Sequence, residues 1–157
     1  MPRFVSPHDS ASIFYRDYIP EVQTGSEHKE LALVFLHGWP MSSRMWEQHL
    51  VQLCQDHSFR CIAPDRRGFG DSEWNGPYSS DPAKRGITYN TFADDVNCLL
   101  EKLVVGDFVF IGGSMGSGES LLCWERSAYV RQRCKVLSSP ISTTTDSTRT
   151  PRSRIIK

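Results

Sequence analysis

The sequence lacks both a charge imbalance and a long hydrophobic segment. Its 18 Lys and Arg residues balance 18 Asp and Glu residues, so the formal net charge is zero. Nucleic acids and anionic membranes are bound by basic surfaces, so we expect neither partner. The longest apolar run, Leu31 to Leu36, is much shorter than the roughly 20 residues that span a bilayer. Because the first ten residues also lack the apolar core of a secretory signal, we expect a cytoplasmic protein.

Paired cysteines are also missing. The five cysteines are Cys54, Cys61, Cys98, Cys123 and Cys134, an odd number with no CxxC motif. A disulfide framework or a zinc site needs cysteines in pairs at short, regular spacing. We therefore predict small buried thiols in a reducing compartment, and we expect no metal and no other cofactor.

Strand-like and helix-like segments alternate along most of the chain. We expect strands at residues 4–5, 12–19, 31–36, 59–63 and 108–111 and from 135 onward, and helices at residues 43–57, 91–103 and 119–129. Ser43 is the expected N-cap of the first helix, and Asp94 and Asp95 are expected to favour the positive end of the second. This order predicts an α/β fold, with a mostly parallel sheet and helices on both faces.

The last 20 residues have a different composition. Residues 138–157 contain five Ser, five Thr and two Pro, and isoleucines are their only sizeable apolar side chains. Such a segment buries too little apolar area to offset its ordering entropy. We therefore predict one domain at residues 1–137 and a disordered tail at 138–157. The tail's three Arg and one Lys against one Asp are too weak a charge to indicate nucleic-acid binding.

The segment Gly112-Gly113-Ser114-Met115-Gly116 fits the pattern G-x-S-x-G. It follows a buried strand and opens a helix, which is where a nucleophile elbow belongs. Gly112 and Gly116 would supply the small flanks, and the N–H of Met115 would face a developing oxyanion. A turn without chemistry and a nucleotide-binding loop are the alternatives. The second is disfavoured because Ser114 replaces the second glycine of G-x-G-x-x-G.

The segment His37-Gly38-Trp39-Pro40 ends the first core strand. Because the carboxyl ends of parallel strands meet at one rim, the N–H of Trp39 is expected to complete an oxyanion hole beside Ser114. The Trp39 indole would wall the pocket, or else pack in the core. We expect His37 to hold backbone groups rather than act as a base, and Asp65 to accept N–H bonds in its turn.

Four blocks together resemble the α/β-hydrolase superfamily, in particular its cofactor-free haloperoxidase, arylesterase and perhydrolase group. The blocks are HGWPMSSRMW (37–46), DRRGFGDS (65–72), NTFADDV (90–96) and GGSMGSGE (112–119). The resemblance implies the α/β-hydrolase fold, Ser114 as nucleophile, Trp39 and Met115 as oxyanion donors, and a small ester or acyl substrate. Epoxide hydrolases and haloalkane dehalogenases share HGxP but carry Asp at the nucleophile position, which Ser114 occupies here.

The sequence departs from that family after the nucleophile. The family places an acid and then a His downstream of its serine. The 43 residues after Ser114 contain no His, and Asp146 is their one carboxylate outside the elbow helix. We therefore expect the N-terminal half of a hydrolase, truncated after about the sixth strand, with an exposed sheet edge that favours self-association. A serine without a base is a weak nucleophile, so a non-catalytic binding remnant or a non-functional fragment stay open.

Overall fold

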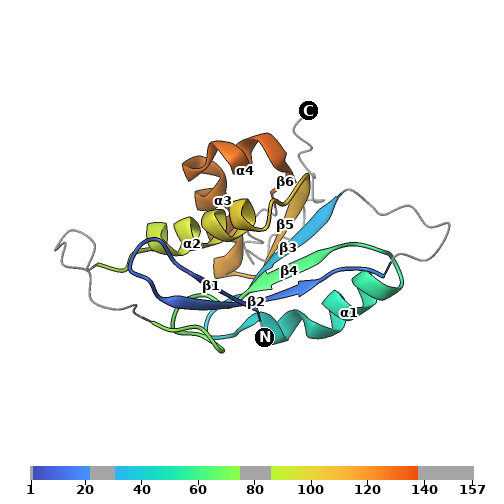
Figure 1. Ribbon diagram of the computed structural model, residues 1–157, viewed down its shortest axis with the longest axis horizontal. Helices are drawn as coiled ribbons and strands as arrows, with labels where there is room; N and C mark the ends of the chain where they lie inside the picture. The colour runs from blue at the N-terminus through green and yellow to red at the C-terminus, as the bar shows by residue number, and fades with distance from the viewer. Residues whose placement is uncertain (1, 22–30, 75–85, 138–157) are drawn as a thin grey trace, which may run out of the picture.

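A computed structural model describes residues 2–21, 31–74 and 86–137 (Figure 1). Six strands form one sheet in the order β1-β2-β4-β3-β5-β6. The strands are β1 (Arg3–Val5), β2 (Ser12–Tyr18), β3 (Ala32–Leu36), β4 (Cys61–Pro64), β5 (Phe108–Gly112) and β6 (Cys134–Val136). Strand β2 pairs antiparallel with β1 and β4, whereas the pairs β3–β4, β3–β5 and β5–β6 are parallel. The expected α/β fold is confirmed, and the predicted tail at 138–157 lies outside the described residues.

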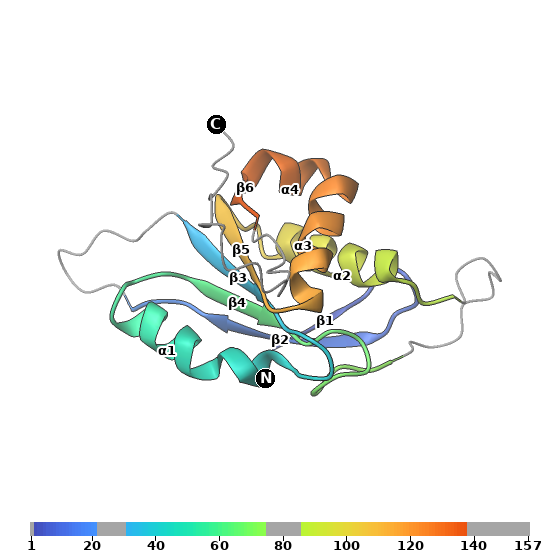
Figure 2. The same cartoon turned by 180° about the vertical axis from the view of Figure 1, so that it is seen from behind.

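Helices cover both faces of the sheet (Figures 1 and 2). The helices are α1 (Glu47–Gln55) on one face, and α2 (Tyr89–Lys102), α3 (Met115–Arg126) and α4 (Ala128–Arg133) on the other. Strand β3 is buried throughout because both of its faces pack against helices. Val34 and Leu36 join the core beneath α2 and α3, while Leu33 and Phe35 join the core with α1. This alternation explains why the segment is continuously apolar in sequence.

The first helical segment does not begin as expected. A 3-10 turn (Ser43–Trp46) precedes α1, and its cap is Ser42, whose hydroxyl accepts from the N–H of Arg44 at 3.4 Å. Ser43 is buried instead, and its N–H donates to Asp65 Oδ1 at 2.7 Å. The prediction of Ser43 as N-cap is therefore wrong: Ser43 is the first residue of the turn, and its hydroxyl accepts from Arg16 Nε at 3.1 Å instead.

Helix α2 begins at Tyr89, where Thr88 and Thr91 form a capping box. The first turn contains no acidic residue, so the expected placement of Asp94 and Asp95 at the positive end of the helix is wrong. Asp94 instead pairs with Arg126 at the surface, and Asp95 pairs with buried Arg67. Ion pairs with other segments, rather than the helix dipole, explain the positions of both carboxylates.

Helix α3 begins at Met115 rather than at residue 119, and it ends at Arg126. The hydroxyl of Ser127 then accepts from the N–H of Val130 and caps a separate helix, α4. The early start was missed because Gly116 and Gly118 have low helix propensity. The prediction of one helix over 119–129 is thus wrong at both ends.

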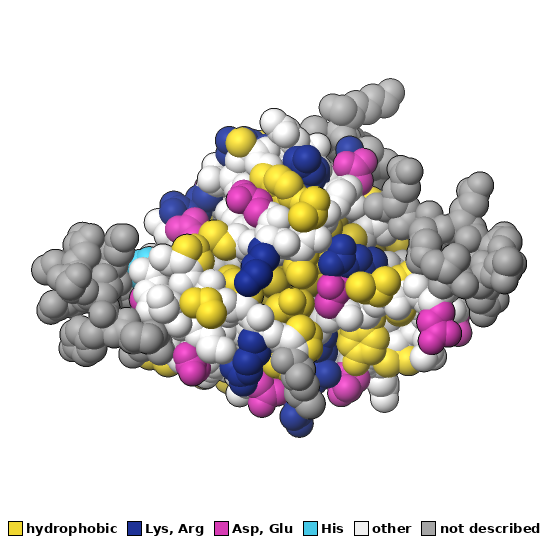
Figure 3. All heavy atoms as spheres, viewed as in Figure 1, with side chains coloured by type: hydrophobic (Ala, Val, Ile, Leu, Met, Phe, Trp, Pro, Cys, Tyr) yellow, Lys and Arg dark blue, Asp and Glu magenta, His cyan; other side chains and the backbone are white. Residues whose placement is uncertain are grey.

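All five cysteine thiols are free, and Cys54, Cys61 and Cys123 are buried. Basic and acidic side chains are interspersed over the face seen in Figure 3. Within residues 2–21, 31–74 and 86–137, no helix is both long and apolar enough to cross a bilayer.

Candidate active site

Ser114 occupies a strained turn between β5 and α3. Its backbone has φ 51° and ψ −113°, a combination that residues other than glycine rarely adopt. The turn is held by the N–H of Gly116, which donates to the carbonyl of Gly113 at 2.9 Å, and by Ser117 Oγ, which donates to the carbonyl of Gly112 at 2.8 Å. The serine itself is exposed. A strand-to-helix turn that lifts an exposed serine in this way is the geometry of a nucleophile elbow.

The two glycines that flank the elbow have no room for a side chain. A Cβ on Gly116 would lie 2.2 Å from the carbonyl oxygen of Leu36, and a Cβ on Gly112 would lie 2.5 Å from the nitrogen of Ser117. Both neighbours are backbone atoms, which cannot rotate aside. The helix therefore starts in direct contact with the end of strand β3.

The turn after β3 lies beside the elbow. The N–H of Gly113 donates to the carbonyl of Leu36 at 3.0 Å, and a Cβ on Gly38 would lie only 3.4 Å from the Cβ of Ser114. Trp39 follows Gly38 in this turn. Met115 is the first residue of α3, where helical N–H groups have no partner within the helix. The structure thus brings together the two segments that carry the expected oxyanion donors.

An aromatic cleft of about 260 Å³ opens next to these residues. Its lining residues are Trp39, Phe69, Trp74, Ile87, Thr88, Tyr89, Phe92 and Met115. The Trp39 side chain lines the cleft and is 66% exposed, so it is not a core residue. Sequence reasoning missed the aromatic residues contributed by the loop after β4 and by the start of α2. Their signal was the density of aromatic residues around the second and third family blocks.

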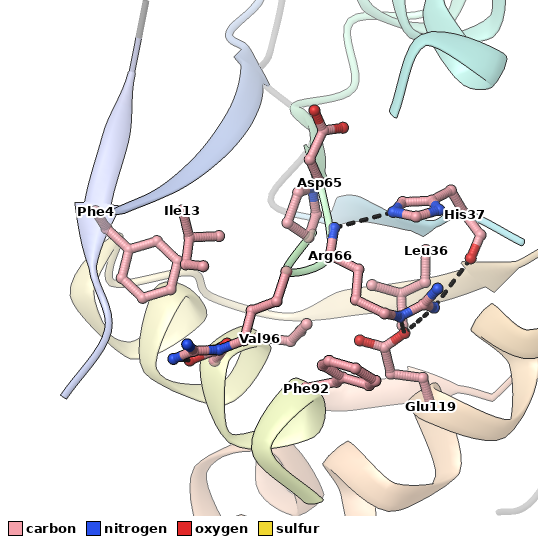
Figure 4. A pocket seen from close by; sticks show the side chains of 12 residues that line it. Phe4, Ile13, Leu36, His37, Asp65, Arg66, Phe92, Val96 and Glu119 are labelled. Carbon is pink, nitrogen blue, oxygen red and sulfur yellow. Dashed lines mark hydrogen bonds and ion pairs between the residues drawn. The ribbon is translucent and has the colours of Figure 1, made fainter. Parts of the chain in front are cut away.

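His37 is buried, and both of its ring nitrogens are engaged. Nδ1 lies 2.9 Å from the carbonyl oxygen of Gly38. Nε2 accepts from the N–H of Arg66 at 2.9 Å, the bond drawn in Figure 4. These bonds require a neutral ring with its proton on Nδ1. Burial lowers the pKa of His37, the bond to Gly38 acts in the opposite direction, and the charge of Arg66 lowers the pKa further. The ring therefore holds the turn and has no free nitrogen to act as a base.

The lowered pKa of His37 predicts that its contribution to stability depends on pH. Because the folded-state pKa lies below the value of about 6.5 expected in the unfolded chain, the contribution is complete above that pH. It is lost as the pH falls below about 6.5 towards the folded-state pKa. We expect the difference in unfolding free energy between wild type and His37→Asn to shrink from pH 7.5 to pH 5.5. Urea denaturation at both pH values measures it, and a constant or growing difference would contradict the prediction.

Asp65 organises the loop after β4. Its Oδ1 accepts from the N–H of Ser43 at 2.7 Å, and its Oδ2 accepts from the N–H of Asp71 at 2.8 Å. Gly70 has φ 55°, and a Cβ there would lie 1.9 Å from Asp65 Oδ2. The expectation that Asp65 accepts backbone N–H bonds in its turn is confirmed.

Two buried ion pairs lie beneath this rim, and sequence reasoning found neither. Arg66 Nε donates to Glu119 Oε2 at 2.9 Å, and Arg66 Nη2 donates to the carbonyl of His37 at 3.1 Å (Figure 4). Arg67 Nη2 donates to Asp95 Oδ1 at 3.2 Å, and its side chain is fully buried. Paired arginines and acidic residues within the family blocks were the available signal, but charged side chains are solvated by default.

Comparisons with known proteins agree with this architecture. Residues 32–146 match the family described as alpha/beta hydrolase fold. A non-heme chloroperoxidase of Kitasatospora aureofaciens is 35% identical over 133 residues, which cover 85% of this chain and 42% of that protein. A bifunctional esterase/perhydrolase of Acinetobacter calcoaceticus is 33% identical over 119 residues, covering 74% of this chain and 36% of its own length.

Solved structures show the same partial match. A bromoperoxidase from Bacillus anthracis aligns with a TM-score of 0.63 and 31% identity, covering 86% of this chain and 42% of that one. An esterase from Exiguobacterium antarcticum aligns with a TM-score of 0.64 and 27% identity, covering 87% and 44%. This chain thus spans less than half the length of these relatives. Since the family match covers most of its sequence, the chain belongs to the α/β hydrolase fold family.

Proposed function

We propose that Ser114 is the nucleophile of a carboxylic-ester hydrolase site that works through an acyl-serine intermediate. The backbone N–H groups of Trp39 and Met115 form its oxyanion hole. The strained backbone of Ser114, exposed beside Gly38 at the turn from β5 to α3, is the observation that carries this proposal. A preformed pair of N–H donors stabilises the oxyanion that develops in acyl transfer, and loss of one such donor typically costs about 10²–10³-fold in rate.

The aromatic cleft supplies the binding half of the proposal. Trp39 and Met115 line the cleft and also provide the two proposed donors, so a substrate seated there has its carbonyl close to Ser114. The esterase and perhydrolase names of relatives support a small ester as the substrate. We propose that the apolar part of the ester occupies the cleft.

Within the described part of the chain, the component that the proposed site lacks is a histidine free to act as general base. His37 uses both ring nitrogens on the backbone, and residues 115–157 contain no His. Removal of the base in serine hydrolases leaves roughly 10³–10⁴-fold catalysis over water. We therefore expect covalent capture of strongly electrophilic reagents and little ester turnover by this chain alone.

Labelling with an alkyl fluorophosphonate tests the nucleophile. We expect slow, stoichiometric modification, located at Ser114 by peptide mass spectrometry and abolished in Ser114→Ala. The rate should fall well below that of a full-length relative, since base assistance is worth about 10²–10⁴-fold. Modification of another residue in a chain shown to be folded would overturn the elbow assignment. Rapid labelling with ester turnover would reveal a general base other than His37.

Binding without turnover is the second candidate function, favoured by the size of the aromatic cleft. Trp39 and Trp74 both line it, so a bound ester should quench tryptophan fluorescence. Quenching that persists in Ser114→Ala without any labelling of wild type would favour this function.

Self-association stays a prediction. It rests on β6, the last strand in the sheet order, which has no outer neighbour within the described part of the chain.

A further inference from the structure

The ion pair between Arg66 and Glu119 joins two elements of the candidate active site. The side chains are 2% and 5% exposed, respectively. Arg66 follows strand β4, whereas Glu119 lies on α3, about one turn after Met115. Arg66 Nε donates to Glu119 Oε2 at 2.9 Å, and Nη2 donates to the same oxygen (Figure 4). The pair therefore connects the loop after β4 with the helix that starts at the elbow.

Arg66 also holds His37 at two points. Its Nη2 donates to the carbonyl of His37 at 3.1 Å, and its main-chain N–H donates to Nε2 of the His37 ring at 2.9 Å. The ring then donates from Nδ1 to the carbonyl of Gly38 at 2.9 Å. That carbonyl belongs to the same planar peptide unit as the N–H of Trp39. Holding the carbonyl on one side of the peptide therefore aims the Trp39 N–H towards the other.

We propose that Arg66 and Glu119 are positioning residues for the oxyanion hole. This inference rests on the proposed function. The Arg66 guanidinium holds the carbonyl of His37, one peptide before the unit that carries the Trp39 N–H. Through Glu119 it also holds the helix that carries the Met115 N–H. The pair thus keeps the two N–H groups at a constant spacing when charge develops on a substrate oxygen.

The guanidinium of Arg66 also lies beside two aromatic rings at the wall of the cleft. The guanidinium carbon lies 5.9 Å from the ring centre of Phe69 and 5.6 Å from that of Phe92. Both rings also line the aromatic cleft. In the described part of the chain Arg66 Nη1 has no hydrogen-bond partner, and the guanidinium as a whole lies over these two rings. An Arg66→Met substitution keeps an apolar side chain beside both rings, so loss of the guanidinium should disturb the N–H donors rather than the cleft.

Stability alone does not explain a buried ion pair at this place. Replacing such a pair with apolar side chains of similar volume is often neutral or stabilising, because the cost of desolvating two charges disappears. The double variant Arg66→Met/Glu119→Met should therefore fold. A positioning role and a merely structural role then predict different outcomes for the chemistry at Ser114.

The test is the saturation kinetics of labelling by an alkyl fluorophosphonate. In the double variant we expect the maximal labelling rate to fall roughly 10–100-fold, since small misplacements of catalytic groups cost about this much. The half-saturating reagent concentration and the melting temperature should stay close to wild type. The matched control is Arg60→Met/Asp17→Met. It removes a bidentate pair (3.0 and 2.8 Å) at the opposite end of β4, and it should leave the maximal rate unchanged.

Arg66→Lys is the second variant, should the double variant fail to fold. Lysine keeps the positive charge beside Glu119 but lacks the planar fork that reaches Glu119 and the carbonyl of His37 together. We expect it to fold and to show the same selective loss of maximal rate. A wild-type maximal rate in a folded Arg66 variant would overturn the inference while leaving the nucleophile assignment intact. Absence of Ser114 labelling in wild type would overturn both.

Discussion

Gly116→Ala should unfold the elbow, whereas Gly118→Ala, two residues later in α3, should not. A Cβ on Gly116 would lie 2.2 Å from the carbonyl oxygen of Leu36, at the end of the central strand β3. Relief requires that α3 move away from the sheet, taking Ser114 and Met115 with it. We expect a loss of about 3 kcal/mol or more in unfolding free energy, at the upper end of overpacking effects.

Gly118 provides the matched control because it lies in the same helix with open space around it. A Cβ at this position meets no atom within 4 Å. Alanine is the better helix former, so Gly118→Ala should stabilise the protein by about 0.5–1 kcal/mol. Urea denaturation measures both variants, and fluorophosphonate labelling reports on the elbow. Equal effects of the two substitutions, or normal labelling of Gly116→Ala, would contradict the close contact between α3 and β3.

Asp95→Ala should destabilise the protein far more than Asp94→Ala, although the two residues are neighbours on α2. Asp95 is buried and accepts hydrogen bonds from Arg67 and from Ser6 Oγ, which ties α2 to the loop after β4 and to the first hairpin. Removing Asp95 leaves fully buried Arg67 with Asp9 as its remaining carboxylate partner and takes away the acceptor of Ser6 Oγ. We expect a loss of about 3–5 kcal/mol.

Asp94 makes an equally well-formed pair, but at the surface. Its two carboxylate oxygens accept from Arg126 Nε and Nη2 at 2.7 and 2.6 Å, with both side chains partly exposed. Solvent screens such pairs, so Asp94→Ala should cost less than about 1 kcal/mol. Denaturation curves of the two variants, collected together, give the difference. A cost for Asp95→Ala as small as that for Asp94→Ala would show that Arg67 is satisfied without Asp95, for example through Asp9.

Local patterns predicted those parts of the fold that depend on neighbouring residues. The continuous apolar run at 31–36 became β3, because a strand that serves two cores has no polar face. The spacing of apolar residues located α1 and α2 to within a few residues. The order of strand, glycine-rich turn and helix also predicted where Ser114 would lie, since strain at an elbow is a short-range property.

Other features depended on contacts between segments far apart in the chain. The hydroxyl of Ser43 accepts from Arg16 Nε, 27 positions away, and its N–H donates to Asp65, 22 positions away. Packing against Leu36 admitted Gly116 to a helix that its propensity disfavours. The apolar area that α3 buries against the sheet supplied the stabilising free energy that helix propensity did not.

The α/β architecture and the turn that carries Ser114 could thus be predicted from local sequence, because periodicity and glycine content act over a few residues. Which charged side chains are buried, and which groups they bind, depends on contacts between distant segments. Arg66 meets Glu119 across 53 positions, and Arg67 meets Asp95 across 28. Hydrophobic periodicity does not distinguish these side chains from partly exposed ones such as Asp94. Their pairing exists because the sheet brings β4, α2 and α3 to one rim, where an unpaired charge would be too costly to bury.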